Sequence, residues 1–423
     1  MNNIQDIKNI LNKNINNFNM KYIKRNRKID FKDIIYGLSL KTIYNSYDKV
    51  VYEINKNNLN KNNLNKISKS GFIKKQNFIN NLDLDNLNND LLNYIYKNKY
   101  EKRVLAVDGS YLKTLSILNN DNLKFSSKKN NYTSSIIGGL YDVDKKIIIN
   151  YNHTTSVNER KNFEEQLKYV RKGDTLLFDR GYYSEYLIYI LNKNHINYLF
   201  RMKNNILCSK YIIKNNLNEY IYKDENKISY KIVNYKINNN NNKENNKNNK
   251  DNKEYKEEQN NNTNIKEKKD KKIIDDEYYI LTNLIDLNID DIKNLYAKRW
   301  TIETHFKEAK YTTSLNEINS RNINNLLKEI RIHNLVYILY YYYYNCFKDK
   351  LNFKYEFNNK LSLEFFIRDI LYILIYKRKY KKDIIKITDI LPIIYIQRKN
   401  RHFIRESKRK VSIWYIKKEK IIL

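Results

Sequence analysis

The sequence has few residues that interrupt secondary structure or cross-link the chain. Among its 423 residues there are only 7 glycines, 1 proline and 2 cysteines. Cys208 and Cys346 are too few for a disulfide framework or a four-ligand zinc site. The longest apolar run, 335–344, falls short of the roughly 20 residues that a membrane-spanning helix needs. Because the Asn-rich start has no apolar signal segment, we expect a cytoplasmic protein without membrane contact.

Acidic residues are also few in proportion. The chain carries 80 Lys and Arg against 47 Asp and Glu, a net charge of +33. An excess of this size indicates a polyanionic partner, most simply nucleic acid. AT-rich codons, which favour Lys, Asn, Ile and Tyr, would raise the count by themselves, so composition leaves both explanations open. The excess is densest in the tail, where Lys377 to Lys420 hold 16 Lys and Arg against 4 Asp and Glu, a net of +12.

The few glycines are unevenly placed. Five of the seven lie between positions 109 and 181, namely Gly109, Gly138, Gly139, Gly173 and Gly181. We interpret them as positions that need a backbone conformation closed to other residues. Ordinary turns would account equally well for Gly138, Gly139 and Gly173.

The hydrophobic pattern divides the chain into five regions. Residues 1–98 have helical spacing and predict a DNA-binding or assembly domain, or a plain helical bundle. Residues 99–205 mix strands (104–108 before a glycine turn, 134–140, 146–151, 175–179, 198–202) with helices (162–170, 184–192), which predicts an α/β fold. Residues 206–275 form an insertion with β pieces at 210–213 and 228–233 and an Asn/Lys-rich tract that we expect to be disordered. Residues 276–345 return to the core with a strand at 277–283 and a helix at 289–310, and residues 346–423 are helical to about 376 and then basic.

Two aspartates end apolar strands. Asp108 closes Leu105-Ala-Val-Asp-Gly-Ser110, and Asp179 lies in Leu176-Leu-Phe-Asp-Arg-Gly-Tyr182. A carboxylate where a buried strand emerges is costly unless it is paired or bound to a metal. Taken singly, either one is weak support for function, because many strands end in an Asp that caps a turn.

The helix predicted at 289–310 carries two adjacent stripes. Tyr296, Arg299, Glu303 and Lys310 fall within an arc of about 60°, and the apolar Leu295, Ile302, Phe306 and Ala309 fall in a neighbouring arc. One stripe can therefore pack on a sheet while the other presents a carboxylate among cations. By itself the pattern also fits an ordinary amphipathic helix, with Arg299 and Glu303 as a surface pair worth a few tenths of a kcal/mol.

Two strand-borne aspartates and one helix-borne glutamate make a set of hard oxygen ligands. Such a set suits Mg²⁺ or Mn²⁺ rather than zinc. Two such ions, roughly 3.5–4 Å apart, can stabilise both the attacking and the leaving oxygen of a phosphodiester displacement.

The spacing Tyr296, Arg299, Glu303, Lys310 resembles the Tyr-Arg-Glu-Lys signature of insertion-sequence 4 family transposases. The neighbouring Arg299-Trp-Thr-Ile-Glu-Thr-His-Phe-Lys307, together with Asp108-Gly-Ser110 and Asp179-Arg-Gly-Tyr182, strengthens the resemblance. Separations of 71 residues between the aspartates and 124 from Asp179 to Glu303 also fit. These proteins are DDE transposases with a ribonuclease H-like core, and they commonly carry a β-rich insertion where residues 206–275 lie.

The resemblance implies an activity and its residues. Asp108, Asp179 and Glu303 would be the catalytic residues and would hold two Mg²⁺ (or Mn²⁺) ions. Tyr296, Arg299 and Lys310 would contact DNA phosphates, and Trp300 would either pack in the core or stack on an unpaired base. The partners would be double-stranded DNA, as terminal inverted repeats and as target, and a second copy of the chain in a synaptic dimer at the nucleoid.

Two other functions remain open from the sequence. One is a nuclease of the same fold that cuts DNA without strand transfer. The other is a basic DNA-binding protein without catalysis, such as a decayed transposase, although the intact Asp108, Asp179 and Glu303 argue against decay. Terminal inverted repeats beside the coding region would separate a transposase from both.

Overall fold

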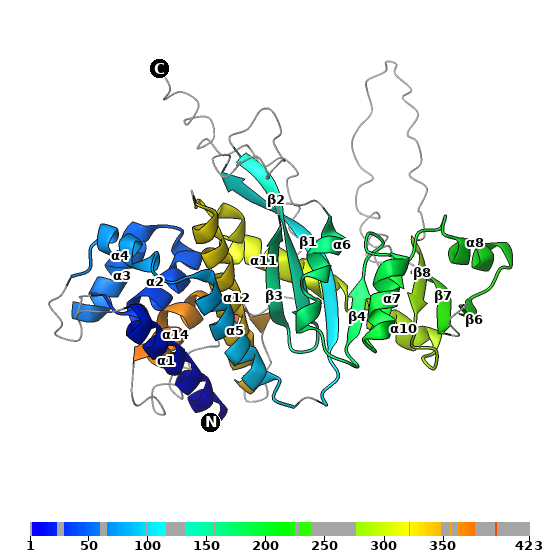
Figure 1. Ribbon diagram of the computed structural model, residues 1–423, viewed down its shortest axis with the longest axis horizontal. Helices are drawn as coiled ribbons and strands as arrows, with labels where there is room; N and C mark the ends of the chain where they lie inside the picture. The colour runs from blue at the N-terminus through cyan, green and yellow to red at the C-terminus, as the bar shows by residue number, and fades with distance from the viewer. Residues whose placement is uncertain are drawn as a thin grey trace, which may run out of the picture.

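The structure is a computed structural model in which a mixed sheet lies beside a layer of helices (Figure 1). It describes residues 2–22, 29–59, 66–98, 100–115, 132–154, 158–224, 228–237, 276–320, 322–347, 356–357, 363–376 and 394–395. The Asn/Lys-rich tract and almost all of the basic tail, including the sequence expectations for them, lie outside these residues. In the part that is described, no helix is long and apolar enough to cross a membrane.

The helical layer combines N-terminal helices with helices from the last third of the chain. Its N-terminal members are α1 (Asn2–Tyr22), α2 (Phe31–Tyr44), α3 (Tyr47–Leu59), α4 (Lys69–Gln76) and α5 (Asn81–Ile95), as the spacing predicts. The starts of α2 and α5 are fixed by capping boxes, with Asp30 and Asn80 as caps. Helix α12 (Ile323–Phe347), a π-helical turn (Phe366–Ile370) and α14 (Leu371–Tyr376) pack among them. The Tyr36 hydroxyl, for example, donates to the Arg368 carbonyl at 2.9 Å.

The sheet has the strand order β3-β2-β1-β4-β5-β8-β7-β6. Its first five strands are β1 (Val104–Leu115), β2 (Tyr132–Asp142), β3 (Ile147–Thr154), β4 (Thr175–Phe178) and β5 (Asn197–Arg201). β1, β2 and β3 form an antiparallel meander, and β4 and β5 run parallel to β1. This is the ribonuclease H-like arrangement, as predicted. Strands β8 (Asp276–Thr282), β7 (Ser229–Ile237) and β6 (Glu219–Lys223) extend the sheet beyond β5, so the insertion continues the core sheet.

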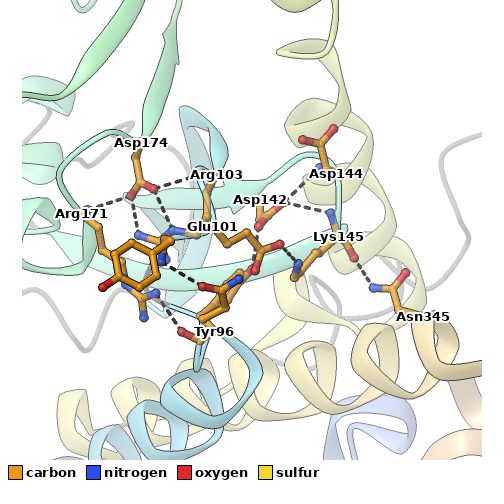
Figure 2. Close-up of polar contacts among 11 residues, drawn as sticks. Tyr96, Glu101, Arg103, Asp142, Asp144, Lys145, Arg171, Asp174 and Asn345 are labelled. Carbon is orange, nitrogen blue, oxygen red and sulfur yellow. Dashed lines mark hydrogen bonds and ion pairs between the residues drawn. The ribbon is translucent and has the colours of Figure 1, made fainter.

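A buried ion pair lies directly below the junction of β1 and β4. Arg103 Nε donates to Asp174 Oδ1 at 3.1 Å, and Nη2 donates to Oδ2 at 2.5 Å. Both side chains are almost fully buried, with 3% and 1% exposed. Figure 2 shows this pair beside Tyr96 of α5 and Arg171, whose guanidinium donates to the Tyr96 carbonyl at 3.0 Å. The pair therefore ties the start of the sheet to the helical layer.

Several elements differ from the sequence expectations. β1 runs straight through Gly109, where a turn was expected, because β2 pairs with it along its whole length. Residues 210–213 belong to helix α8 (Leu207–Lys214), which buries Ser209 and Ile212 at helical spacing. The helix expected at 162–170 is α6 (Glu159–Glu164) followed by a 3₁₀ turn, and that at 289–310 is divided into α10 (Ile289–Ala297) and α11 (Trp300–Thr312). Helix α7 (Glu185–Lys193) and strands β2, β3, β4, β5, β7 and β8 lie close to the expected positions, whereas β6 was not predicted and β9 (Glu356–Phe357) falls where a helix was expected.

Two glycines allow helices to approach both faces of β2. A Cβ at Gly138 would stand 2.0 Å from Asn162 Oδ1 of α6, and one at Gly139 would stand 2.9 Å from the Phe306 ring of α11. Neighbouring residues of a strand point to opposite faces, so α6 and α11 cover opposite sides of the sheet. Of the five glycines between 109 and 181, only Gly173 has a positive φ, at 84°. The interpretation of the others as unusual backbone positions was therefore wrong for Gly138 and Gly139, where close packing is the reason.

Breaking the Arg103–Asp174 pair should destabilise the whole protein. Arg103→Met leaves a buried carboxylate without its partner, which costs about 3–5 kcal/mol. Lys69→Met, which removes the exposed Lys69–Asp48 pair, is the matched control and should cost less than about 1 kcal/mol. Urea unfolding of the full chain measures both values. Equal, small losses in the two variants would contradict the structural role given to Arg103.

Candidate active site

Asp108 and Asp179 lie at the same level of neighbouring strands. The β1–β4 register pairs Val104 with Thr175 and continues to Val107 with Phe178. One residue further along each chain brings Asp108 beside Asp179, at the point where β4 ends. The sequence predicted that both aspartates end buried strands; this is correct for Asp179, which directly follows β4, and wrong for Asp108, which lies inside β1. The register explains why the two meet.

Glu303 reaches the same region from α11. Ile302, Phe306 and Ala309 are buried, as predicted for the sheet-facing stripe, and Phe306 packs at Gly139, which pairs with Asp108 across β1 and β2. Glu303 is half-buried, and its Oε1 accepts from Arg299 Nη2 at 2.6 Å. The structure therefore places Glu303 near Asp108, with its carboxylate paired to a cation.

The Asp108 carboxyl has an unusual protonation equilibrium. Burial raises its pKa to about 7, and the charges of Glu303 and Glu159 add to the rise. The Arg299 charge and the Gly109 amide, which donates to Oδ1 at 2.9 Å, oppose it. Perturbation by burial together with like charges is typical of functional carboxylates.

Tyr296 and Arg299 lie behind the carboxylates. Tyr296 is 4% exposed, and its hydroxyl donates to the carbonyl of Phe178 at 3.3 Å. Arg299 is 6% exposed and lies in the short break between α10 and α11. Burial lowers the pKa of Arg299, but neighbouring Tyr296, Glu303 and Asp179 raise it overall. These two buried residues support the acidic site from the protein interior, through the Phe178 carbonyl and Glu303.

Trp300 and Lys310 are the more accessible members of the predicted DNA-binding set. Two environments were predicted for Trp300. Because its side chain is 63% exposed, the prediction that it packs in the core is wrong. Lys310 is half-buried on α11. Burial and the charge of Lys113 lower the pKa of Lys310, while Asp108 raises it, which places Lys310 in the field of the acidic site.

The sequence analysis missed two charged residues at the site. Arg201, the last residue of β5, has Nη1 3.8 Å from Asp179 Oδ1 and stacks over the Tyr278 ring at 4.1 Å. Glu159, the first residue of α6, lies between Gly109 and Gly181. Arg201 is the last residue of a buried strand, and Asp179 directly follows one, so the position of Arg201 carried a signal. Glu159 lies in a polar segment without such a signal.

His305 lies apart from these residues. It is 2% exposed, and its Nε2 lies 2.6 Å from the Tyr151 hydroxyl. Burial lowers the pKa of His305 to about 3, so the ring is neutral.

The donor set fits a hard divalent cation. Asp108, Asp179 and Glu303 offer only oxygen donors, and Asp179 Oδ1 is buried without a hydrogen-bond partner. As the side chains stand, no three His, Cys, Asp or Glu residues in the described part of the chain converge closely enough to hold an ion.

The Asp108 carboxyl should make stability depend on pH when divalent cations are absent. Its folded pKa of about 7 lies above the ordinary 3.8 of the unfolded chain. The resulting stabilisation is fully present below about pH 3.8 and is lost as the pH rises through 7. Asp108→Asn should therefore gain about 2.7 kcal/mol over the wild type between pH 5 and pH 8. Urea unfolding with EDTA at both pH values measures this, and a constant difference would contradict the shift.

Comparison with known proteins identifies the family. A family model described as "Transposase DDE domain" matches residues 99–339, which is more than half of the chain. Among solved structures, a piggyBac transposase synaptic complex with hairpin DNA aligns with a TM-score of 0.45 and 12% identity, covering 91% of this chain and 82% of that chain. No curated protein matches the sequence. The family model covers the strands and the helix that carry Asp108, Asp179 and Glu303, and the chain belongs to the DDE transposases.

Proposed function

We propose that this transposase moves an insertion sequence by cutting and rejoining DNA, and that Asp108, Asp179 and Glu303 catalyse both steps. Water attacks the phosphodiester at the element's end and releases a 3′-OH. That hydroxyl then attacks a second phosphodiester and displaces its 3′ oxygen. The observation that carries the proposal is the β1–β4 register, which sets Asp108 beside Asp179 within the field of Glu303.

The carboxylates would hold two divalent cations, Mg²⁺ or Mn²⁺. Such ions activate the attacking oxygen and neutralise the charge on the departing one. Asp179 offers an oxygen without a hydrogen-bond partner. Asp108 offers a carboxyl group whose charged form is disfavoured by burial. Arg299 holds Glu303 until a cation competes for the same oxygen.

The exposed residues are assigned to DNA. Trp300 projects into solvent beside the site, which suits stacking on an unpaired base. Lys310 supplies a cation within range of Asp108, where a phosphate would lie. We assign DNA contacts chiefly to these two residues. Tyr296 and Arg299 are almost fully buried. They contribute to phosphate binding indirectly, because they position the carboxylates next to which the phosphate lies.

Other details rest on the resemblance alone. They are membership of the insertion-sequence 4 group, recognition of terminal inverted repeats, a homodimer that pairs two element ends, and location at the nucleoid in the cytoplasm. Of these, the homodimer also suits the proposed reaction, because two ends must be brought together before an element can be moved.

Removing any one of the three carboxylates should stop cleavage. Asp108→Asn, Asp179→Asn and Glu303→Gln should each lower Mg²⁺-dependent nicking of a duplex carrying the flanking terminal repeat by at least about 10³-fold. Binding to the same duplex should remain. Glu317→Gln, on the 3₁₀ turn that follows α11, is the matched control. Full nicking by any of the three variants would exclude that residue from the catalytic set.

The same preparation distinguishes a transposase from a nuclease. A precut end with a free 3′-OH, mixed with supercoiled plasmid, should be joined to the plasmid by the wild type and by Glu317→Gln. Nicking without joining would favour the nuclease alternative.

Lys310→Ala should weaken DNA binding equally for all sequences. One lost phosphate contact reduces the slope of log affinity against log salt by about 1. Lys293→Ala, an exposed lysine on the preceding helix α10, is the matched control and should leave the slope unchanged. Fluorescence anisotropy with labelled duplex at several salt concentrations gives both slopes. A slope for Lys310→Ala equal to the wild-type value would show that Lys310 does not contact a phosphate.

A further inference from the structure

Strand β6 forms one edge of the eight-stranded sheet. Figure 1 shows it with α8 at the end of the molecule away from the N-terminal helices, and it pairs along its length with β7. Just beyond the two ends of β6, the Asp224 amide donates to the Ile228 carbonyl at 3.0 Å and the Asn234 amide donates to the Asn218 carbonyl at 2.7 Å. The even-numbered residues of β6 therefore turn their backbone groups toward β7, and the odd-numbered residues turn theirs outward.

The outward backbone groups of β6 have no partner. They belong to Glu219, Ile221 and Lys223, and in the described part of the chain none of their amides or carbonyls makes a hydrogen bond. The opposite edge strand, β3, differs because α12 packs on it and Asn334 of α12 donates to the Ile149 carbonyl at 3.4 Å. A row of unpaired donors and acceptors is a template for one more strand.

Contacts on both faces hold β6 in its extended form. On one face, Tyr220 packs on Tyr211 of α8, with 4.5 Å between the ring centroids. On the other face, Glu219 forms an ion pair with Lys231 of β7 at 2.9 Å. Because the strand is already ordered, pairing with another strand costs it little further conformational entropy.

The charges of β6 are self-complementary. The strand reads Glu219-Tyr-Ile-Tyr-Lys223, with an acid and a base at equal distances from Ile221. Charged residues on an edge usually prevent pairing. In an antiparallel pair of two copies centred on Ile221, however, Glu219 of each copy lies opposite Lys223 of the other. Lys223 is exposed and forms no ion pair with a described residue, and the Ile221 side chain at the centre is 51% exposed.

We propose that two copies of this chain join edge to edge through β6, so that their two sheets become one continuous antiparallel sheet. The odd-numbered residues would exchange backbone hydrogen bonds, and Tyr220 of one copy would lie opposite Tyr222 of the other as a cross-strand aromatic pair. Such a twofold contact uses the same patch on both subunits and closes at a dimer. The inference rests on the proposed function, which requires two copies to pair two element ends, and it names the surface between them.

Reversed charges test the register of the two strands. Lys223→Glu sets acid against acid and Glu219→Lys sets base against base, so each variant alone should dimerise about tenfold more weakly than the wild type or worse. An equimolar mixture of the two should recover wild-type affinity, because each mixed dimer again pairs opposite charges. Sedimentation equilibrium of the full chain without DNA gives the dimer constants.

The matched control for these variants is Lys193→Glu, which reverses an exposed lysine at the end of α7. It should dimerise as the wild type does. A mixture of Lys223→Glu and Glu219→Lys that associates no better than either variant alone would overturn the inference.

Proline at the centre of β6 tests the backbone pairing. Ile221→Pro removes an outward amide that makes no hydrogen bond within its own chain, a place where a strand tolerates proline. Two hydrogen bonds are lost in each dimer, so dimerisation should weaken by about thirtyfold or more. Ile221→Thr keeps the amide and a branched side chain and should stay within about fivefold of the wild type. Equal affinities of the two variants would overturn the inference, and the mixture of charge variants covers the case in which proline unfolds the strand.

The same measurements, repeated with terminal-repeat duplex, separate this inference from the proposed function. Dimers of equal strength in the wild type and in every β6 variant would refute the β6 contact and leave the proposed homodimer intact. A wild type that stays monomeric with and without the duplex would refute the pairing of two ends and the β6 contact with it. Neither result changes the assignment of the three carboxylates, which is tested by nicking.

Discussion

The parallel register of β1 on β4 is the constraint on which the site depends. At one end of the strand pair, Arg103 and Asp174 form a buried ion pair. At the other end, Asp108 stands beside Asp179, and both pairs are separated by the same 71 residues. Because a slip of one residue would move every side chain to the other face, the buried ion pair and the two aspartates depend on the same strand alignment.

The helices that complete the site depend on close approach to this sheet. Gly138 and Gly139 admit α6 and α11, one on each face of β2. A methyl group at either position would meet Asn162 or Phe306 and would push Glu159 or Glu303 outward. In a chain with so few glycines, these two keep the glutamates within reach of the aspartates.

Sequence reasoning found most of the core because its signals were local. Asp108, Asp179 and Glu303 stood out through their flanking strands and helical spacing, and the ribonuclease H-like core followed from the resemblance. The burial of Tyr296 and the position of Glu159 were not accessible in the same way. Tyr296 depends on the carbonyl of Phe178, and Glu159 depends on the path of α6, so both are set by contacts between distant segments. The split of the predicted 289–310 helix and the helical α8 were likewise decided by packing.

The net charge of +33 has little bearing on the acidic centre itself. Arg299 already forms an ion pair with Glu303. Arg201 Nη1 lies 3.8 Å from Asp179 Oδ1, which is too far for a hydrogen bond. Asp108 and Glu159 are left in mutual repulsion, a state that burial makes more costly. The fold tolerates this only because the register and the glycine contacts hold the carboxylates in place. Divalent cations bound there, as proposed, would relieve this repulsion and would stabilise the folded protein over the unfolded chain.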